Sequence, residues 1–377
     1  MKARKTVALG FLMLLAASYL DNVRGPLVPV LAEQFKISYG TTTWFLVLGN
    51  LGAVIALFAM LPVLQLFSIT SVAKSLCLLF VLLAMFLFSV SELNGLFVFA
   101  TLLGSLIPVF GALANLFLIE GTHENERSKW MCALHMVYGA ASLTAPIVVS
   151  KLVGNGFSWT TPFLVYVPLI LLTFGVLSKK GKRESSDIST EKSVLSLPRE
   201  QWLAISIFCS YVAAEVMVSV WMMSYLKEVI QLNLQASAPY LSGFFVMMTL
   251  SRAVCFFSLN ETTEKKMLFG CLILSGCALF AGYSGLLWGF VFAGVLGPFF
   301  PIFLSQCSRK FIGSSRSFTL WVLAATQISL AALNLILGRV SDGLGLGVAY
   351  QIPVYLLGFS LVLLWIFFLK EKKRVEV

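Results

Sequence analysis

Apolar stretches of about 20 residues, separated by short polar segments, recur along the whole chain. Each stretch is long enough for an α-helix that crosses the hydrocarbon core of a bilayer. The pattern predicts twelve spanning helices, at residues 7–33, 41–66, 72–91, 95–120, 131–153, 161–178, 201–226, 238–258, 267–285, 287–308, 316–339 and 348–369. We therefore expect an all-α membrane protein.

A single long polar segment divides these spans into six and six. It predicts an N-terminal six-helix bundle at 1–178, a cytoplasmic linker at 179–200 and a C-terminal six-helix bundle at 201–377. The first span of each half carries a Ser-Tyr pair followed by an acid. Asp21 is the fifteenth residue of its span and Glu215 the fifteenth of its own. The match predicts two pseudo-symmetric bundles, with both carboxylates near the middle of the membrane.

Composition supports a membrane protein, because 59% of the 377 residues are hydrophobic and 12% are charged, against roughly 25% charged in soluble domains. The net charge of +10 does not indicate a nucleic-acid partner, since the basic residues lie in short runs between apolar stretches. If the N-terminus is cytoplasmic, Lys36, Lys151, Lys227 and Arg339 are the loop Lys and Arg residues on the other face. The positive-inside rule then predicts that both termini are cytoplasmic. We expect a monomeric, multi-pass protein of a cell membrane, such as a bacterial inner membrane.

Several function classes lack the residues they need. The seven cysteines form no CxxC motif and no Cys/His cluster, so neither a disulfide framework nor a metal site is indicated. A phosphate-binding loop for ATP is absent from the sequence, and we expect no cofactor. An enzyme would need a clustered acid–base set, but the chain has two histidines, His123 in a loop and His135 in a span.

The middle of the first span contains groups that lipid alone does not tolerate. Asp21 and Arg24 lie three residues apart, on one helix face, and Pro26 and Pro29 remove the helix hydrogen bonds to two backbone carbonyls. A charge at the bilayer midplane costs at least ~3 kcal/mol. The two charges either neutralise each other against the bundle or bind a solute or ion, and the cost of placing them there favours the functional reading.

Motifs spread over most of the chain resemble those of a known transporter family. They are YVAAEV at 211–216 with a later Trp221 and Tyr225-Leu226, GALAN at 111–115, LH at 134–135 with Gly139 and Pro146, PFFPIF at 298–303, and GRVSDG at 338–343. The chain resembles the fucose-galactose-glucose:proton symporters of the major facilitator superfamily. This resemblance implies two six-helix bundles around a central path, with spans 1 and 7 facing each other.

Two proton-site positions of that family do not carry a carboxylate in this chain. The fourth-helix position is Gly111, and the first-helix position falls at Gly25 rather than at Asp21. The family's own proton sites therefore do not transfer. If spans 1 and 7 face each other, Arg24 could bridge Asp21 and Glu215. A carboxyl whose distance from Arg24 changes during transport would exchange protons. We hypothesise that Glu215 is the titrating group and Asp21 the structural partner of Arg24.

Other polar or aromatic residues within the spans are candidates for solute binding or ion coupling, although each also has a packing explanation. Interhelical hydrogen bonds are the ordinary role of an amide in a span, and a packed histidine is more common than a proton relay. Asn22 and Asn115 gain support from their family-like positions. The remaining candidates are His135, Tyr138, Tyr211, Trp221, Gln327 and Asn334.

Together these features predict a secondary transporter that works by alternating access. We expect proton-coupled symport of a small polar, sugar-like solute, with the solute, protons and the lipid bilayer as partners. An alternative is a proton-coupled exporter of amphipathic compounds, because Met217, Met222, Met223, Phe299 and Phe300 could line an apolar path. A channel or a receptor remains open on the sequence alone.

Overall fold

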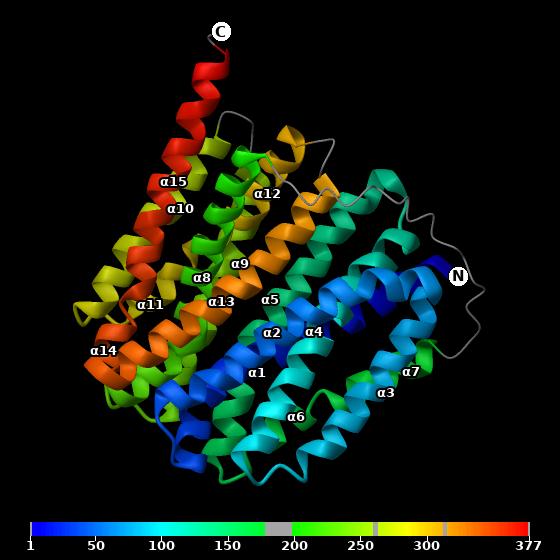
Figure 1. The fold of residues 1–377 in the computed structure, drawn as a ribbon, viewed down its shortest axis with the longest axis vertical. Coiled ribbons are helices and arrows are strands. Elements are labelled where there is room, and N and C mark those ends of the chain that lie inside the picture. The colour runs from blue at the N-terminus through cyan, green and yellow to red at the C-terminus, as the bar shows by residue number, and fades with distance from the viewer. Residues whose placement is uncertain (1, 178–197, 259–262, 312–314, 376–377) are drawn as a thin grey trace. The chain divides into compact units, whose positions relative to one another are not determined.

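The computed structural model describes residues 2–177, 198–258, 263–311 and 315–375, and these residues form helices and short connections without any strand (Figure 1). The all-α prediction is confirmed. Ten helices in the described residues are long and apolar enough to cross a membrane. Serine residues form the N-caps of two helices. Ser38 Oγ accepts the Thr41 N–H at the start of α2, and Ser68 Oγ accepts the Ser71 N–H at the start of α3, both at 3.2 Å.

The chain forms two compact units, and each is described by itself. Unit 1 comprises Met1–Ser189 with Asn233–Ala238. Its helices are α1 (Lys2–Phe35), α2 (Tyr39–Leu66), α3 (Ile69–Leu87), α4 (Leu93–Gly121), α5 (Glu124–Gly154), α6 (Thr161–Leu164) and α7 (Val167–Leu177). Helix α1 packs mainly against α4 and α5, and α2 packs against α4. Residues 178–197, which hold most of the predicted linker, lie outside the described residues.

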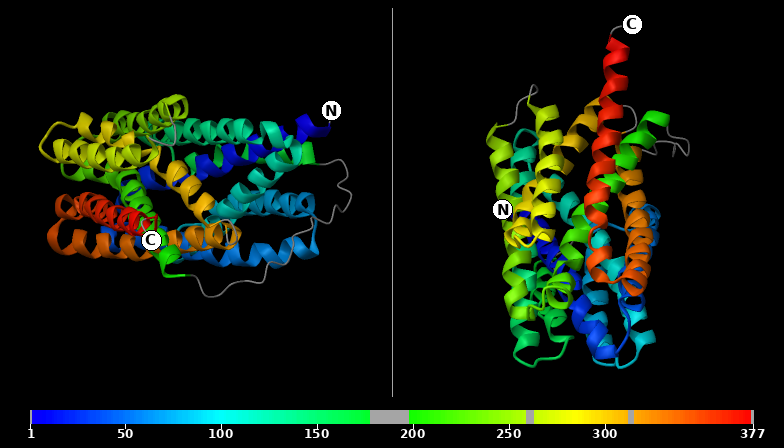
Figure 2. Two further views of the ribbon diagram at one scale, coloured as in Figure 1. Left: turned by 90° about the horizontal axis from the view of Figure 1, so that it is seen from above. Right: turned by 90° about the vertical axis from the view of Figure 1, so that its left-hand side faces the viewer.

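Unit 2 comprises Thr190–Leu232 with Pro239–Val377. Its helices are α8 (Arg199–Glu228), α9 (Leu234–Ser258), α10 (Glu264–Tyr283), α11 (Trp288–Phe292), the 3₁₀ turn η1 (Ala293–Leu296), α12 (Phe299–Lys310), α13 (Ser315–Leu344), α14 (Leu346–Ala349) and α15 (Ile352–Val375). The first residues of α9, 234–238, belong to unit 1. Helix α8 packs mainly against α13 and α15. Helix α15 also runs beside α10, as Figures 1 and 2 show.

Each of the twelve predicted spans coincides with a helical segment of the described chain, but three of the segments are not continuous helices. The predicted span at 348–369 begins in α14 and continues in α15 after a turn at Tyr350 and Gln351. The predicted span at 161–178 is divided into α6 and α7. The predicted span at 287–308 is divided into α11, η1 and α12, because Pro298 and Pro301 cannot donate backbone hydrogen bonds to the preceding turn. The sequence pattern predicted each of these spans as one apolar stretch and did not anticipate the break.

Glycines set the distance between neighbouring helices in unit 1. A Cβ atom at Gly104 of α4 would lie 2.1 Å from the carbonyl oxygen of Gly49 of α2, and a Cβ atom at Gly52 would lie 2.5 Å from the carbonyl oxygen of Thr101. The atoms in the way are backbone, which cannot turn aside as a side chain would. The backbones of α2 and α4 therefore touch, as small residues at helix interfaces in membranes allow.

Substitution of Gly104 by Ala should lower the free energy of unfolding by about 1–3 kcal/mol or more, because α2 and α4 must move apart. Gly111 on the same helix is the matched control, since the nearest atom to its added Cβ is Leu14 Cδ1 at 3.9 Å. The midpoint of thermal unfolding in detergent should fall for Gly104→Ala and stay close to the native value for Gly111→Ala. Equal midpoints for the two variants would contradict the packing described.

Candidate functional site

Asp21 and Arg24 form an ion pair within α1. Arg24 Nη2 donates to Asp21 Oδ1, and Arg24 Nε lies 3.3 Å from the backbone carbonyl oxygen of Asp21. The Arg24 side chain is 16% exposed and the Asp21 side chain 34% exposed, so solvent screens the pair only in part. The predicted pairing within the first span is confirmed.

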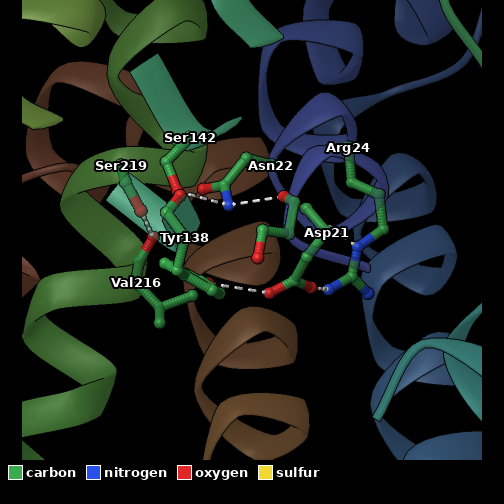
Figure 3. Close-up of polar contacts among 8 residues, drawn as sticks. Asp21, Asn22, Arg24, Tyr138, Ser142, Val216 and Ser219 are labelled. Carbon is green, nitrogen blue, oxygen red and sulfur yellow. Dashed lines mark hydrogen bonds and ion pairs between the residues drawn. The ribbon is translucent and has the colours of Figure 1, made fainter. Parts of the chain in front are cut away.

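Helix α5 supplies further partners for the same turn of α1. The Tyr138 hydroxyl donates to Asp21 Oδ2 at 3.2 Å, and Asn22 Nδ2 donates to Ser142 Oγ at 2.9 Å (Figure 3). Tyr138 and Ser142 are four residues apart and therefore lie on one face of α5, facing α1. Asp21, Asn22, Arg24, Tyr138 and Ser142 together make what we call the α1–α5 polar cluster.

The local sequence of α1 explains why this turn can carry so many polar groups. The helix is continuous through Pro26 and Pro29, so the carbonyls of Asn22 and Gly25 lack their usual helix donors. Gly49 of α2 leaves room for the Arg24 guanidinium, because a Cβ atom at that position would lie 3.2 Å from Arg24 Nη1. The cluster is thus held by α1 and α5 and bordered by α2.

In unit 2, Glu215 lies on α8 and is bound by a side chain from its own helix. The Tyr211 hydroxyl, one turn earlier, donates to Glu215 Oε2. Tyr211 is fully buried, and its ring stacks on Phe299 of α12 with the ring centroids 4.4 Å apart. Glu215 itself is half-buried. The first helix of each unit thus presents a carboxylate that accepts a tyrosine hydroxyl, from α5 in unit 1 and from α8 itself in unit 2.

The other candidate residues have different surroundings. Trp221 is fully buried, and its indole N–H donates to Asn334 Oδ1 at 3.0 Å, so these two residues pack together inside unit 2. Asn115 Nδ2 donates to the Gly111 carbonyl at 3.0 Å, while its buried Oδ1 has no hydrogen-bond partner among the described residues. Gln327 is half-buried on α13. The side chain of His135 lies outside the described residues.

Ser142 belongs to the α1–α5 polar cluster but was not among the candidate residues predicted from the sequence. Its four-residue spacing from Tyr138 was the signal that could have found it. The predicted bridge from Arg24 to Glu215 would join the two units and stays a prediction. Within unit 1, the carboxylate next to Arg24 is that of Asp21.

Comparison with protein-family models gives a match to the Major Facilitator Superfamily over residues 10–312. A comparison with curated protein sequences gives no significant match. The structural comparison finds similar folds over nearly the full length of the chain, and the structures named below are at most 15% identical to it.

Three solved structures illustrate this similarity. A variant of the E. coli fucose:proton symporter FucP is 15% identical, with a TM-score of 0.66 and coverage of 96% of this chain and 98% of that one. A variant of the nucleoside transporter NupG is 14% identical, with a TM-score of 0.74 and coverage of 98% and 99%. A D-xylose-proton symporter is 11% identical, with a TM-score of 0.78 and coverage of 97% and 98%. At such identities the likeness establishes the fold alone.

The ion pair predicts a non-additive effect on stability. Asp21→Asn or Arg24→Gln alone leaves a partly buried charge without its partner and should cost about 1–3 kcal/mol. The double variant removes both charges, so its cost should be smaller than the sum of the two single costs. Thermal unfolding of the four proteins in detergent measures the difference, and strictly additive losses would show that the two charges do not stabilise each other.

Proposed function

Because the chain belongs to the Major Facilitator Superfamily, we propose that this multi-pass membrane transporter carries a small polar solute by proton-coupled symport. The superfamily consists of transporters rather than enzymes. The observation that carries the proposal is the pair of carboxylates, Asp21 on α1 and Glu215 on α8, one in the first helix of each unit. Intramembrane acids are costly and typically mark ion or solute pathways.

The different partners of the two acids support different roles. Asp21 is bound by a guanidinium, which carries the opposite charge, and by a tyrosine hydroxyl. Glu215 accepts a neutral hydroxyl from Tyr211, a group that a protonated carboxyl can also bind. We therefore assign proton coupling to Glu215 and assign to Asp21 the positioning of Arg24.

The class of solute follows from the neutral hydrogen-bonding groups of unit 1. Asn22 and Ser142 are donors and acceptors in the α1–α5 polar cluster, and Asn115 Oδ1 is a buried acceptor in need of a donor. A solute rich in hydroxyl groups matches such neutral groups. The similar structures named above are those of a fucose:proton symporter, a nucleoside transporter and a D-xylose-proton symporter, which agrees with a hydroxyl-rich solute.

The side chains that favoured an exporter of amphipathic compounds are largely enclosed by their own unit. Met217, Met222, Met223 and Phe299 are all 0% exposed, and Phe300 is half-buried. Fully buried side chains cannot line a path in this conformation. This burial favours the symporter over the exporter.

We also propose that both termini lie on the cytoplasmic side of a bacterial inner membrane. Most of the 27 Lys and Arg residues then fall in cytoplasmic segments. A single cysteine introduced at Lys36, an exposed position just after α1, should react with an impermeant reagent added to whole cells.

The solute can be identified by a thermal-shift screen of the purified protein against fucose, D-xylose, nucleosides, organic acids and lipophilic amines. A ligand that binds the folded state raises the melting temperature, and the rise increases with the ratio of ligand concentration to Kd. Sugars or nucleosides should give the largest shift. The direction of transport is then measured by comparing uptake in whole cells with uptake in inverted vesicles, and uptake confined to inverted vesicles would identify an exporter.

Replacement of Glu215 by Gln should abolish pH-gradient-driven accumulation of the solute that the screen selects, down to the level of empty vesicles. The Gln amide cannot take up or release a proton in this way, but its oxygen can still accept the hydrogen bond from the Tyr211 hydroxyl. Counterflow, in which unlabelled solute on one side accelerates exchange of labelled solute, should persist because it needs no net proton movement.

Glu228→Gln is the matched control, since it makes the same change at the exposed end of α8. It should leave both activities intact. Retention of full pH-gradient-driven accumulation by Glu215→Gln would refute the assignment of proton coupling to this residue. Loss of counterflow in the same variant would instead place Glu215 in solute binding.

A further inference from the structure

Four helix ends of unit 2 meet at one surface. Arg309 Nη2, near the end of α12, lies 2.5 Å from Glu264 Oε2 at the start of α10. Lys310 Nζ, also near the end of α12, lies 2.7 Å from Glu200 Oε1 at the start of α8 and 4.3 Å from the centroid of the Phe367 ring of α15. The starts of α8 and α10 therefore lie beside the ends of α12 and α15, and Figure 1 shows the end of α15 extending beyond them.

Basic residues outnumber acidic ones at these helix ends. The basic residues are Arg199, Lys265, Lys266, Arg309, Lys310, Lys370, Lys372, Lys373 and Arg374, and the acidic residues are Glu200, Glu264 and Glu371. We call this set the basic end of unit 2. Because Glu200 and Glu264 pair with the two cations of α12, they leave the other basic residues of the set in excess. The surface formed by the described helix ends is therefore positively charged.

Helix α10 contributes two exposed cations to this surface. Lys265 and Lys266 both lie in its first turn and are exposed. Lys265 Nζ lies 4.6 Å from the centroid of the Phe368 ring of α15, and that ring lies 6.1 Å from the ring of Phe269 of α10. The attraction between the ammonium and the ring holds Lys265 at the level of Phe368.

These cations lie at the depth where lipid headgroups begin. The apolar span of α15 ends at Leu369, one residue after Phe368, and the span of α10 begins at Glu264. A lysine at the end of a span lays its stem along apolar surface and extends its ammonium toward the headgroups. Anionic lipid headgroups attract basic residues in this position, and the attraction falls off within a Debye length. Lys265 and Lys266 are therefore within reach of a lipid phosphate.

Below Lys266, the same face of α10 is apolar and open. Gly270 and Ile273 follow Lys266 by four and seven residues, a spacing that keeps the three on one helix face. Ile273 is 50% exposed, and a Cβ atom added at Gly270 would meet no atom within 4 Å. The face continues through the exposed residues Cys277 and Phe280. A cation above an open apolar stripe matches a phosphate group that is attached to an acyl chain.

We propose that an anionic phospholipid binds α10 at the basic end of unit 2. Its phosphate lies at Lys265 and Lys266, and one acyl chain lies along Gly270 and Ile273. A soluble anion would make no use of the apolar stripe. A basic segment that only sets the orientation of the chain would not need a lysine held against an aromatic ring. The proposal goes beyond the proposed function and does not depend on the solute or on Glu215.

Binding is measured on the purified full-length protein in detergent, by native mass spectrometry and by the midpoint of thermal unfolding. The protein is titrated with dioleoylphosphatidylglycerol, which is anionic, and with dioleoylphosphatidylcholine, which has the same chains but no net charge. The anionic lipid should stay bound and raise the midpoint, because a ligand of the folded state stabilises that state. The zwitterionic lipid should bind more weakly, and equal binding of the two lipids would overturn the proposal.

Replacement of Lys266 by Gln should raise the Kd for phosphatidylglycerol about fivefold, the loss expected for one basic residue near an anionic headgroup. Lys266→Arg keeps the charge and should keep the native Kd. Lys5→Gln is the matched control, since it makes the same change at an exposed lysine near the start of α1 in unit 1. It should leave the Kd unchanged. All three variants should unfold at the native temperature without added lipid, because both positions are exposed.

Two further results would overturn the proposal. Glycerol 3-phosphate supplies a phosphate without acyl chains and should not change the midpoint, so a rise equal to that given by phosphatidylglycerol would identify a site for a soluble anion. An equal loss of affinity in Lys5→Gln and Lys266→Gln would show that the lipid responds only to the overall positive charge. A native Kd in both Lys265→Gln and Lys266→Gln would exclude the site on α10.

Discussion

A polar group within an apolar helix bundle must find its partner inside the bundle, because lipid offers none. This requirement explains the arrangement of both polar regions of the protein. The Asp21 carboxylate is bound by Arg24 and Tyr138, and the Gly297 carbonyl is bound by Arg252. In each case one partner is a guanidinium, which has several hydrogen-bond donors in a fixed plane and stays protonated.

Prolines leave backbone carbonyls without helix donors, and glycines allow a neighbouring helix to come close enough to supply the missing donors. Pro301 exposes the Gly297 carbonyl, and the missing side chain of Gly297 lets α9 approach near enough for Arg252 to bind it. In unit 1, Gly49 leaves the space beside Arg24 while also touching the backbone of α4 at Gly104. Proline thus removes hydrogen bonds within a helix, while glycine allows closer packing of that helix against its neighbour.

The contrast between Asp21 and Glu215 gives the proposed transport cycle its chemistry. The Asp21 carboxylate faces the opposite charge of a guanidinium, while Glu215 is bound by a neutral phenol hydroxyl, which a protonated carboxyl can also bind. A carrier that couples solute movement to protons needs one acid that changes its charge and others that do not.

The sequence by itself determined the helical class, the approximate span positions and the Asp21–Arg24 pair, because apolar stretch length and three-residue helix spacing are local properties of the chain. It also predicted membership of the superfamily, from scattered motifs that the family match then supported. Tertiary structure alone decided which helix supplies each partner. Tyr138 and Ser142 meet α1 across more than a hundred residues, and Arg252 meets Gly297 across 45. The contact between Trp221 and Asn334 was likewise decided by the tertiary structure, since long-range packing determines which side of a mostly apolar helix is buried.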